Sequence, residues 1–212
     1  MKAGHIQIDP FGDFVEVIVS GDSATAISLL NASPLLAKER SAHGATRQGP
    51  NQFFFDRILH YMYEGDTALH MAAAAYQIRI AEELMARGAD VRARNRRGAE
   101  PLHYAVDGGP GLPVWNPSAQ TKIIARLIRA GADPNVTDKS GVAPLHRAVR
   151  NRCAAAVRAL IDGGADPRAP NRSGSTPMLL ATQNTGRGGS GSAEAKAQQQ
   201  AILRILKEHG AT

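Results

Sequence analysis

Three histidines recur along the 212-residue chain, and histidine is a common zinc ligand. His70, His103 and His146 each follow a leucine, and the steps between them are 33 and 43 residues. If these positions recur in successive layers of packed helices, their rings lie about 10 Å apart, whereas ligand atoms lie about 2 Å from one zinc ion. The three side chains therefore cannot ligate a single ion, and we expect no metal site.

The single cysteine and a glycine-rich segment are the other candidates for chemistry. Cys153 follows Arg150 and Arg152, whose guanidinium groups could lower a thiol pKa, but a structural thiol is the favoured interpretation. Residues 186–192 read Gly-Arg-Gly-Gly-Ser-Gly-Ser, which could cradle a phosphate, yet the Lys-Ser/Thr that ends a P-loop is missing. No paired carboxylates, Ser-His-Asp set or Cys-His set falls on matching positions. We therefore predict no enzyme, no catalytic residue and no cofactor.

The elements that carry these residues repeat with a fixed period. The tetrapeptides 67–70, 100–103 and 143–146 end in Leu-His, and a degraded copy occupies 176–179. Gly-Ala-Asp recurs at 88–90, 131–133 and 164–166, always thirteen residues before the next histidine or its replacement, Leu179. The longer step of 43 residues is one period with ten inserted residues. A period near 33 is typical of a stacked repeat array.

Each period predicts two short helices and a turn. Pro101, Pro144 and Pro177 suit the first position of a helix, where proline has no N–H to lose. Apolar residues then follow helical spacing, and after an interruption the same spacing resumes in a second helix. In the repeat that begins near residue 139, Gly164 is expected to end this second helix. Neither helix can bury its apolar stripe alone, so the units must stack.

On these motifs the chain resembles the ankyrin-repeat family. The resemblance implies an all-α fold, a solenoid of stacked helix-turn-helix units with β-hairpin-like fingers between them. We expect a single domain over 1–212. Its units are expected at about 13–36, 64–96, 97–138, 139–171 and 172–212, with insertions at about 47–63, 108–120 and 185–197. The resemblance also gives the repeated histidine a structural role, a hydrogen bond between the helix entry and the neighbouring finger.

The first insertion is rich in aromatic residues. It contains five of the ten aromatic residues of the chain, namely Phe53, Phe54, Phe55, Tyr61 and Tyr63. One interpretation is that the segment folds back over the irregular N-terminal unit. The other is that it forms a contact site for a partner, because aromatic side chains anchor interfaces. Both can hold for different residues.

The second insertion carries Trp115 in a proline-rich loop, and the third carries Arg187 among glycines. Both lie at the turn between the two helices of their unit, so they share one edge of the stack. Trp115 must pack on a neighbouring segment or on a partner. A small-ligand or nucleotide site between the two loops is a further alternative.

Charge suggests the kind of partner. The formal net charge is +6, and arginines cluster near the expected fingers and first helices. In ankyrin arrays these elements line the concave face, so the resemblance implies a positive groove that binds an acidic or mixed protein partner. The predicted contacts are Arg94, Arg96, Arg97, Lys139, Arg147, Arg150 and Arg172, together with Phe53, Phe54, Phe55, Tyr61, Tyr63 and Trp115.

Nucleic acid is the alternative partner for the same positive face. Against it, no recognised nucleic-acid motif occurs, and Asp90, Asp133, Asp138 and Asp166 interrupt the fingers. The lack of an apolar leader or membrane-length run and the lone cysteine favour a monomer in a reducing cytoplasm, not bound to a membrane. The arginine-rich composition suggests a bacterial source.

Overall fold

The structure is a computed structural model that describes residues 10–49, 51–183 and 191–211. The first part contains α1 (Pro10–Ser20), α2 (Ser23–Ala32), the 3-10 helices η1 (Pro34–Ala37) and η2 (Asn51–Phe53), and the strands β1 (Phe54–Phe55) and β2 (His60–Tyr61). The remaining helices are α3 (Ala68–Ala74), α4 (Ile78–Ala86), α5 (Pro101–Ala105), α6 (Pro117–Arg129), α7 (Pro144–Arg150), α8 (Ala154–Asp162), α9 (Pro177–Thr182) and α10 (Ala193–Glu208).

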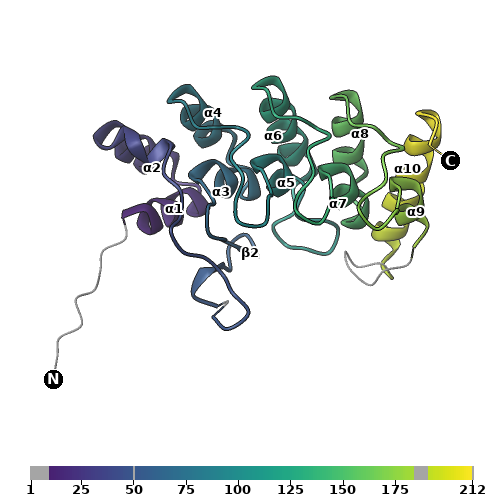
Figure 1. Cartoon of the computed structure of the whole chain (residues 1–212), viewed down its shortest axis with the longest axis horizontal. Coiled ribbons are helices and arrows are strands. Elements are labelled where there is room, and N and C mark those ends of the chain that lie inside the picture. Colours follow the sequence, from purple (N-terminus) through teal and green to yellow (C-terminus); the bar gives the residue numbers. More distant parts are fainter. Residues whose placement is uncertain (1–9, 50, 184–190, 212) are drawn as a thin grey trace.

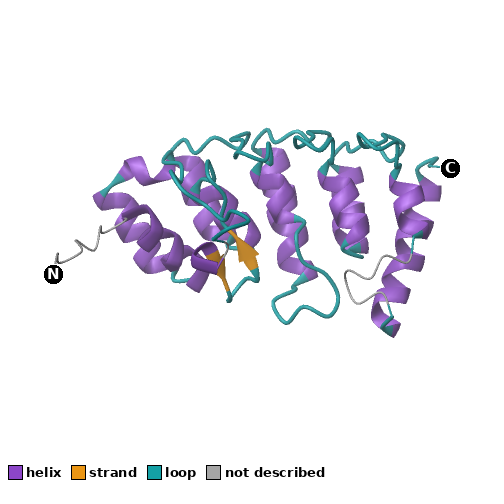
Figure 2. Ribbon diagram, turned by 60° about the horizontal axis from the view of Figure 1, so that its bottom comes forward, coloured by secondary structure: helices purple, strands orange, loops and turns teal. Residues whose placement is uncertain are grey.

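The helices form consecutive antiparallel pairs that stack side by side in one row. Figure 1 shows the pairs following one another from α1 and α2 to α9 and α10, and Figure 2 shows the loops between units gathered along one edge. First helices pack on first helices, as α3 does on α5, and second helices on second helices, as α6 does on α8. The predicted all-α solenoid of stacked helical pairs is confirmed.

The helices begin where the sequence signals placed them. Prolines 101, 144 and 177 each occupy the first position of a helix, and Thr176 caps α9 by accepting the backbone N–H of Leu179. Gly164, with φ of +98°, follows the end of α8 in the left-handed conformation that glycine adopts without steric cost. Local sequence signals thus mark the starts of α5, α7 and α9 and the end of α8.

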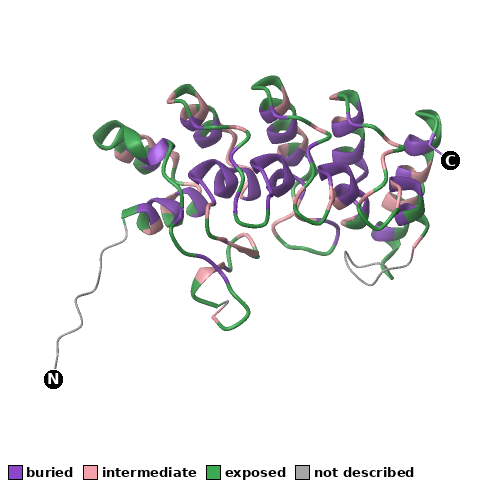
Figure 3. Cartoon of the chain, viewed as in Figure 1, coloured by how far each residue is buried: buried purple, intermediate pink, exposed green. Residues whose placement is uncertain are grey.

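The core runs through the whole stack between the two rows of helices (Figure 3). Every residue of α3 and of α5 is buried, because first helices are enclosed by layers on both sides. Second helices bury only a stripe, as in α4 with Ile80, Ala81 and Leu84. Repeated leucines such as Leu69 and Leu102 are fully buried, and each contributes about 2 kcal/mol of hydrophobic stabilisation.

The fingers are tight turns, each built on one side chain. In the finger between α4 and α5, the Asn95 side chain accepts the backbone N–H groups of Arg97 and Ala99, and Gly98 takes a φ of +75°. Neighbouring fingers are joined by backbone bonds, from Arg96 N to Glu64 O at 2.8 Å and from Lys139 N to Arg97 O at 2.9 Å. These bonds align the finger residues along one edge of the array.

The inserted segments contain regular secondary structure. The first forms η2 and an antiparallel hairpin in which Phe54 pairs with Tyr61 and Phe55 with His60. The second ends inside α6, which starts at residue 117 and has 13 residues against 9 in α4 and α8. Likewise α10 begins at residue 193, within the third insertion. Part of the inserted sequence therefore lengthens second helices.

Among the described helices, none has the length and apolarity needed to cross a membrane.

Candidate partner-binding groove

Two of the repeated histidines, His70 and His103, tie their first helix to the next finger, as the resemblance predicted. In His70 and His103 the Nδ1 atom accepts the N–H of the N-cap residue, Thr67 or Glu100, at 3.1 Å. This fixes the proton on Nε2, which donates to the Ala99 carbonyl at 3.1 Å and to the Val142 carbonyl at 3.0 Å, respectively. His146 repeats the Nδ1 contact with the N–H of Ala143 at 3.2 Å.

Burial keeps these rings neutral. It lowers the pKa of His70 and His146 and brings that of His103 to about 4. The rings of His70 and His103 therefore serve as neutral linkers with one donor and one acceptor, which is a structural role, whereas the buried Nε2 of His146 has no hydrogen-bond partner among the described residues.

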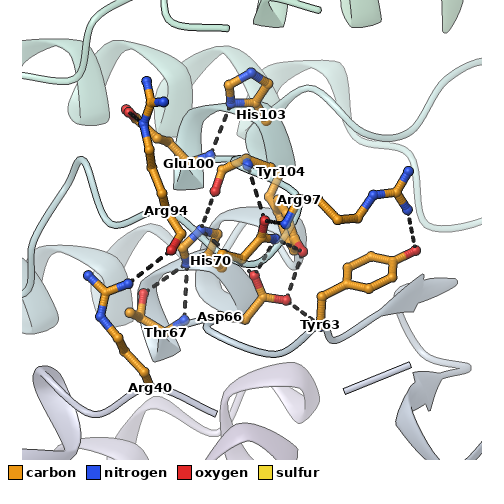
Figure 4. A network of polar contacts seen from close by, with 12 residues as sticks. Arg40, Tyr63, Asp66, Thr67, His70, Arg94, Arg97, Glu100, His103 and Tyr104 are labelled. Carbon is orange, nitrogen blue, oxygen red and sulfur yellow. Dashed lines mark hydrogen bonds and ion pairs between the residues drawn. The ribbon is translucent and has the colours of Figure 1, made fainter. Parts of the chain in front are cut away.

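A buried carboxyl group joins the inserted hairpin to the second and third units (Figure 4). Asp66 is fully buried and accepts the Tyr104 hydroxyl at 2.7 Å, the Asn95 amide at 2.8 Å and the Tyr63 backbone N–H at 2.6 Å. Burial raises the pKa of Tyr104 well above its usual value, so the phenol keeps the proton that it donates. One side chain thus positions a finger, a first helix and the end of the hairpin.

A second polar cluster lies beside it. Arg147 donates to Asp138 Oδ2 at 2.9 Å and to Asp107 Oδ2 at 3.3 Å. Burial alone would raise the pKa of Asp107 and Asp138, but the neighbouring guanidinium lowers both below their usual values. Two carboxylates therefore neutralise the charge of Arg147.

His60 attaches the hairpin to this cluster. Its Nε2 lies 2.9 Å from Asp107 Oδ2, its Nδ1 lies 2.8 Å from the Tyr61 carbonyl, and its ring lies 4.5 Å from that of Tyr104. Because both nitrogens face acceptors, both carry protons in this arrangement. Burial opposes the charged ring, but the hydrogen bond and charge of Asp107 outweigh it and raise the pKa of His60.

The raised pKa predicts a pH-dependent contribution of His60 to stability. The folded-state pKa exceeds the unfolded value of about 6.5, so the contribution is complete below that value and is lost as pH rises through the folded-state pKa. Replacing His60 by glutamine should therefore cost about 1–2 kcal/mol below pH 6 and less at higher pH. Urea unfolding of both proteins across this pH range measures the difference, and a pH-independent cost would contradict the assignment of a cationic ring.

These elements enclose a groove of about 520 Å³ on the finger side of the array. The hairpin supplies Leu59, Tyr61 and Tyr63 to one wall. The opposite wall includes Leu112 from the second insertion and Arg150 from the end of α7. Asp107 and Asp138 also line the groove, but both are ion-paired with Arg147. The surface therefore combines apolar and aromatic groups with an arginine that has no ion pair among the described residues.

The predicted cationic contacts fall into three groups. Arg94 is ion-paired with Glu100 at 3.1 Å, and Arg147 is paired as described above. Arg96 and Arg97 donate to neutral acceptors, the Ala45 carbonyl and the Tyr63 hydroxyl. The third group comprises exposed side chains with no hydrogen-bond or ion-pair partner among the described residues, those of Lys139, Arg150 and Arg172. Only the last two groups retain charge that a partner can neutralise.

The predicted aromatic contacts also divide. Tyr61 and Tyr63 line the groove, and Phe54 lies 4.6 Å from the Tyr61 ring. Phe53 packs against the core, and Phe55 is buried within it. The structure removes Phe55 from the contact set, because its ring is enclosed by the chain itself. The inserted segment therefore packs against the core and also lines the groove with two half-buried tyrosines.

Trp115 lies in an internal polar chain. It packs against the core, and its Nε1–H donates to Gln120 Oε1 at 3.2 Å. Gln120 in turn donates to the Tyr76 hydroxyl, which donates to the Asp107 carbonyl. The tryptophan is therefore partnered within the protein. The glycine-rich segment with Arg187, the other half of the predicted small-ligand site, lies outside the described residues.

Cys153 has the structural role that was favoured from the sequence. Its side chain is buried, its thiol donates to the Gly108 carbonyl at 2.8 Å, and burial raises its pKa to about 12. Such a thiol is not nucleophilic at neutral pH. Within the described ranges, no group of three or more His, Cys, Asp or Glu side chains is arranged to hold a metal ion.

Sequence analysis missed the residues that assemble the groove. His60, Asp66, Tyr104 and Asp107 were not singled out, although all are at the junction of the hairpin with the second and third units. Tyr104 and His60 have no counterpart at the equivalent positions of other units, so the repeat pattern carried no signal for them. The one available signal was the position of Asp66 directly before the first capping threonine.

Comparison with known families supports the repeat pattern. A family model described as ankyrin repeats, in three copies, matches residues 116–212, and one described as a single ankyrin repeat matches residues 64–96. No curated protein matches the chain.

Proposed function

Because this chain belongs to the ankyrin-repeat family, whose repeats are generally protein-interaction modules, we propose that it binds a protein partner through the groove on its finger side. The partner presents acidic and apolar side chains. The observation that carries the proposal is the composition of the groove, where Tyr61, Tyr63 and Leu112 lie beside Arg97 and Arg150, neither of which has an ion pair among the described residues.

Size and rigidity are consistent with this function. A stable protein complex buries about 1,600 Å² in total, so a partner that fills the groove must also contact the neighbouring fingers. The backbone bonds between fingers and the Asp66 cluster hold the surface in place before binding. Preorganisation of this kind reduces the entropy lost on association.

Charge reversal in the groove tests the proposal. Partners are captured from lysate of the source cell with the wild type, and binding of the captured protein is then measured with Arg97→Glu/Lys139→Glu/Arg150→Glu. We expect the affinity to fall about 100-fold, because three attractive charges become repulsive. The matched control is Arg79→Glu/Arg129→Glu/Arg204→Glu, which changes the same number of exposed arginine or lysine charges on second helices.

The control variant should bind like the wild type, and raising the salt concentration should weaken wild-type binding. Equal loss in both variants would reject the groove and leave only a general charge effect. Undiminished binding of the groove variant would reject it as well.

Nucleic acid is the less favoured partner for this face. The exposed carboxylates of Asp90, Asp133 and Asp166 recur along the fingers, where a continuous polyanion would pass close to all of them. A mobility-shift assay at low salt distinguishes the two partners, because the proposal predicts no shift.

The proposal also retains the expectation of a monomer in a reducing cytoplasm, with which the free, buried thiol of Cys153 is compatible.

A further inference from the structure

A second, smaller pocket lies on the other side of the two hairpin tyrosines. It has a volume of about 360 Å³ and shares Tyr61, Tyr63 and Arg97 with the groove. Its remaining lining comes from Arg96 and from Ala45, Thr46 and Arg47 of the segment before the hairpin. Three arginines thus converge on one pocket, and none of the described residues that line it is acidic.

The neighbouring chain fixes two of these arginines. Arg96 donates to the Ala45 carbonyl, and Arg97 donates to the Tyr63 hydroxyl at 2.9 Å. Both guanidinium groups approach the ring of Tyr63, with their carbons 5.7 Å and 4.8 Å from its centroid. These contacts orient the side chains and leave their positive charge uncompensated, since a carbonyl, a hydroxyl and a ring are all neutral.

The segment that carries Arg47 is tied to the hairpin. Ala45 N donates to the Met62 carbonyl at 2.8 Å, and the backbone of Gly44 lies so close to residues 63 and 64 that a Cβ there would come within 2.2 Å of Glu64 N. Thr46 uses its hydroxyl oxygen to accept from Gly49 N, which leaves its O–H free to donate into the pocket. The pocket is therefore preorganised on both sides.

Like charges that line one pocket repel one another, and an anion between them removes that cost. A single carboxylate would leave two of the three charges without a partner. A phosphoryl group carries about two negative charges at neutral pH and accepts guanidinium donors in bidentate fashion. The charge of the pocket therefore matches a phosphoryl group better than an acidic side chain.

We infer that this pocket, formed by Arg47, Arg96 and Arg97 around Tyr61 and Tyr63, binds a phosphorylated side chain of the protein partner. The inference rests on the proposed function and adds a specific requirement to it. Because the two pockets meet at Tyr63 and Arg97, a partner segment that fills the groove can extend its phosphoryl group into the cationic pocket. A protein is favoured over nucleic acid as the source, since positive charge is concentrated here and the next fingers carry exposed aspartates.

Small probes test the pocket without a known partner. N-acetyl-O-phosphoserine amide and N-acetyl-glutamate amide are titrated into the full chain, and backbone amide shifts of residues 45–47, 61–63 and 96–98 are followed by NMR. We expect saturable shifts at these residues and about tenfold tighter binding of the phosphoserine probe. Equal affinity for the two probes, or no saturable shift, would overturn the inference.

Two single variants make the test residue-specific. Arg47→Ala should weaken phosphoserine binding about tenfold, because it removes a charge-assisted hydrogen bond. Arg57→Ala is the matched control, since Arg57 is an exposed arginine in the turn of the same hairpin, has no polar partner among the described residues and lines neither pocket. Equal loss in both variants would show a diffuse charge effect and contradict the assignment.

Two further experiments test the requirement for a phosphoryl group separately from the proposed function, and test whether that group comes from a protein. Phosphatase treatment of the lysate before capture should abolish partner binding, whereas undiminished capture that still depends on Arg150 would reject the phosphoryl requirement and leave the groove intact. An oligothymidylate that binds more tightly than the phosphoserine probe would overturn the assignment to a protein.

Discussion

Replacing Asp66 by alanine is expected to lower the free energy of unfolding by about 3–4 kcal/mol, which is a large fraction of the stability of a small domain. The carboxyl group is fully buried, and it accepts the Tyr104 hydroxyl, the Asn95 amide and the Tyr63 N–H. The substitution leaves three donors without this acceptor inside the protein, and each buried donor without an acceptor costs about 1–3 kcal/mol before the structure relaxes.

Urea unfolding followed by far-UV circular dichroism measures the loss. Asp66→Asn should have an intermediate cost, because the amide keeps one acceptor oxygen but turns a donor toward Asn95. Asp162→Ala is the matched control, since this aspartate is exposed at the end of α8 and has no side-chain partner among the described residues. A cost for Asp66→Ala no larger than that of the control would show that the cluster does not hold the hairpin and the two units together.

Replacing Arg152 by alanine is expected to cost about 2–4 kcal/mol, located in the last helical pair. Arg152 is buried, and its guanidinium donates to the carbonyls of Ala181 and Gln183 at the end of α9. The backbone of Arg152 is held at a φ of +60°, a conformation that costs a residue other than glycine about 1–2 kcal/mol. The side-chain bonds offset this strain, so removing them leaves the strain in place.

Glycine at the same position separates the two contributions. Arg152→Gly loses the same hydrogen bonds but relieves the backbone, so it should be about 1 kcal/mol less destabilising than Arg152→Ala. Hydrogen exchange should become faster in α9 and α10 and remain unchanged in α1 to α4, because each repeat contacts only its neighbours. Uniformly faster exchange along the whole array would be inconsistent with a local clasp.

Tyr76, the residue of unit two that is equivalent to Arg152, shows why the contact made by Arg152 could not be predicted from the repeat pattern. Tyr76 precedes Arg152 by two repeats, has a φ of +53°, and donates its hydroxyl to the Asp107 carbonyl of the next unit. The two residues share a backbone conformation and each reaches over the interface to its next unit, yet a tyrosine and an arginine have no common sequence pattern. The shared function becomes visible only when the units are stacked.

Much of the fold could be predicted from the sequence because the determinants are local and repeated. The prolines that start helices and the left-handed Gly164 act within a few residues of their own position, and the linking histidines recur with the repeat. The insertions were predicted as departures from the period, and part of the sequence predicted as the second and third insertions lies in α6 and α10. Their internal structure has no repeated pattern to predict it.

The sequence by itself determined the helical pairs and the order in which they stack. Only the tertiary structure decided which arginines retain their charge, because Arg94 and Arg147 are neutralised by carboxylates whereas Arg96 and Arg97 meet neutral acceptors. The physical reason is the separation in sequence between the residues that interact. Helix propensity and capping depend on residues a few positions apart, whereas the partner of a charged side chain can lie far away in the sequence, as Ala45 lies 51 positions from Arg96.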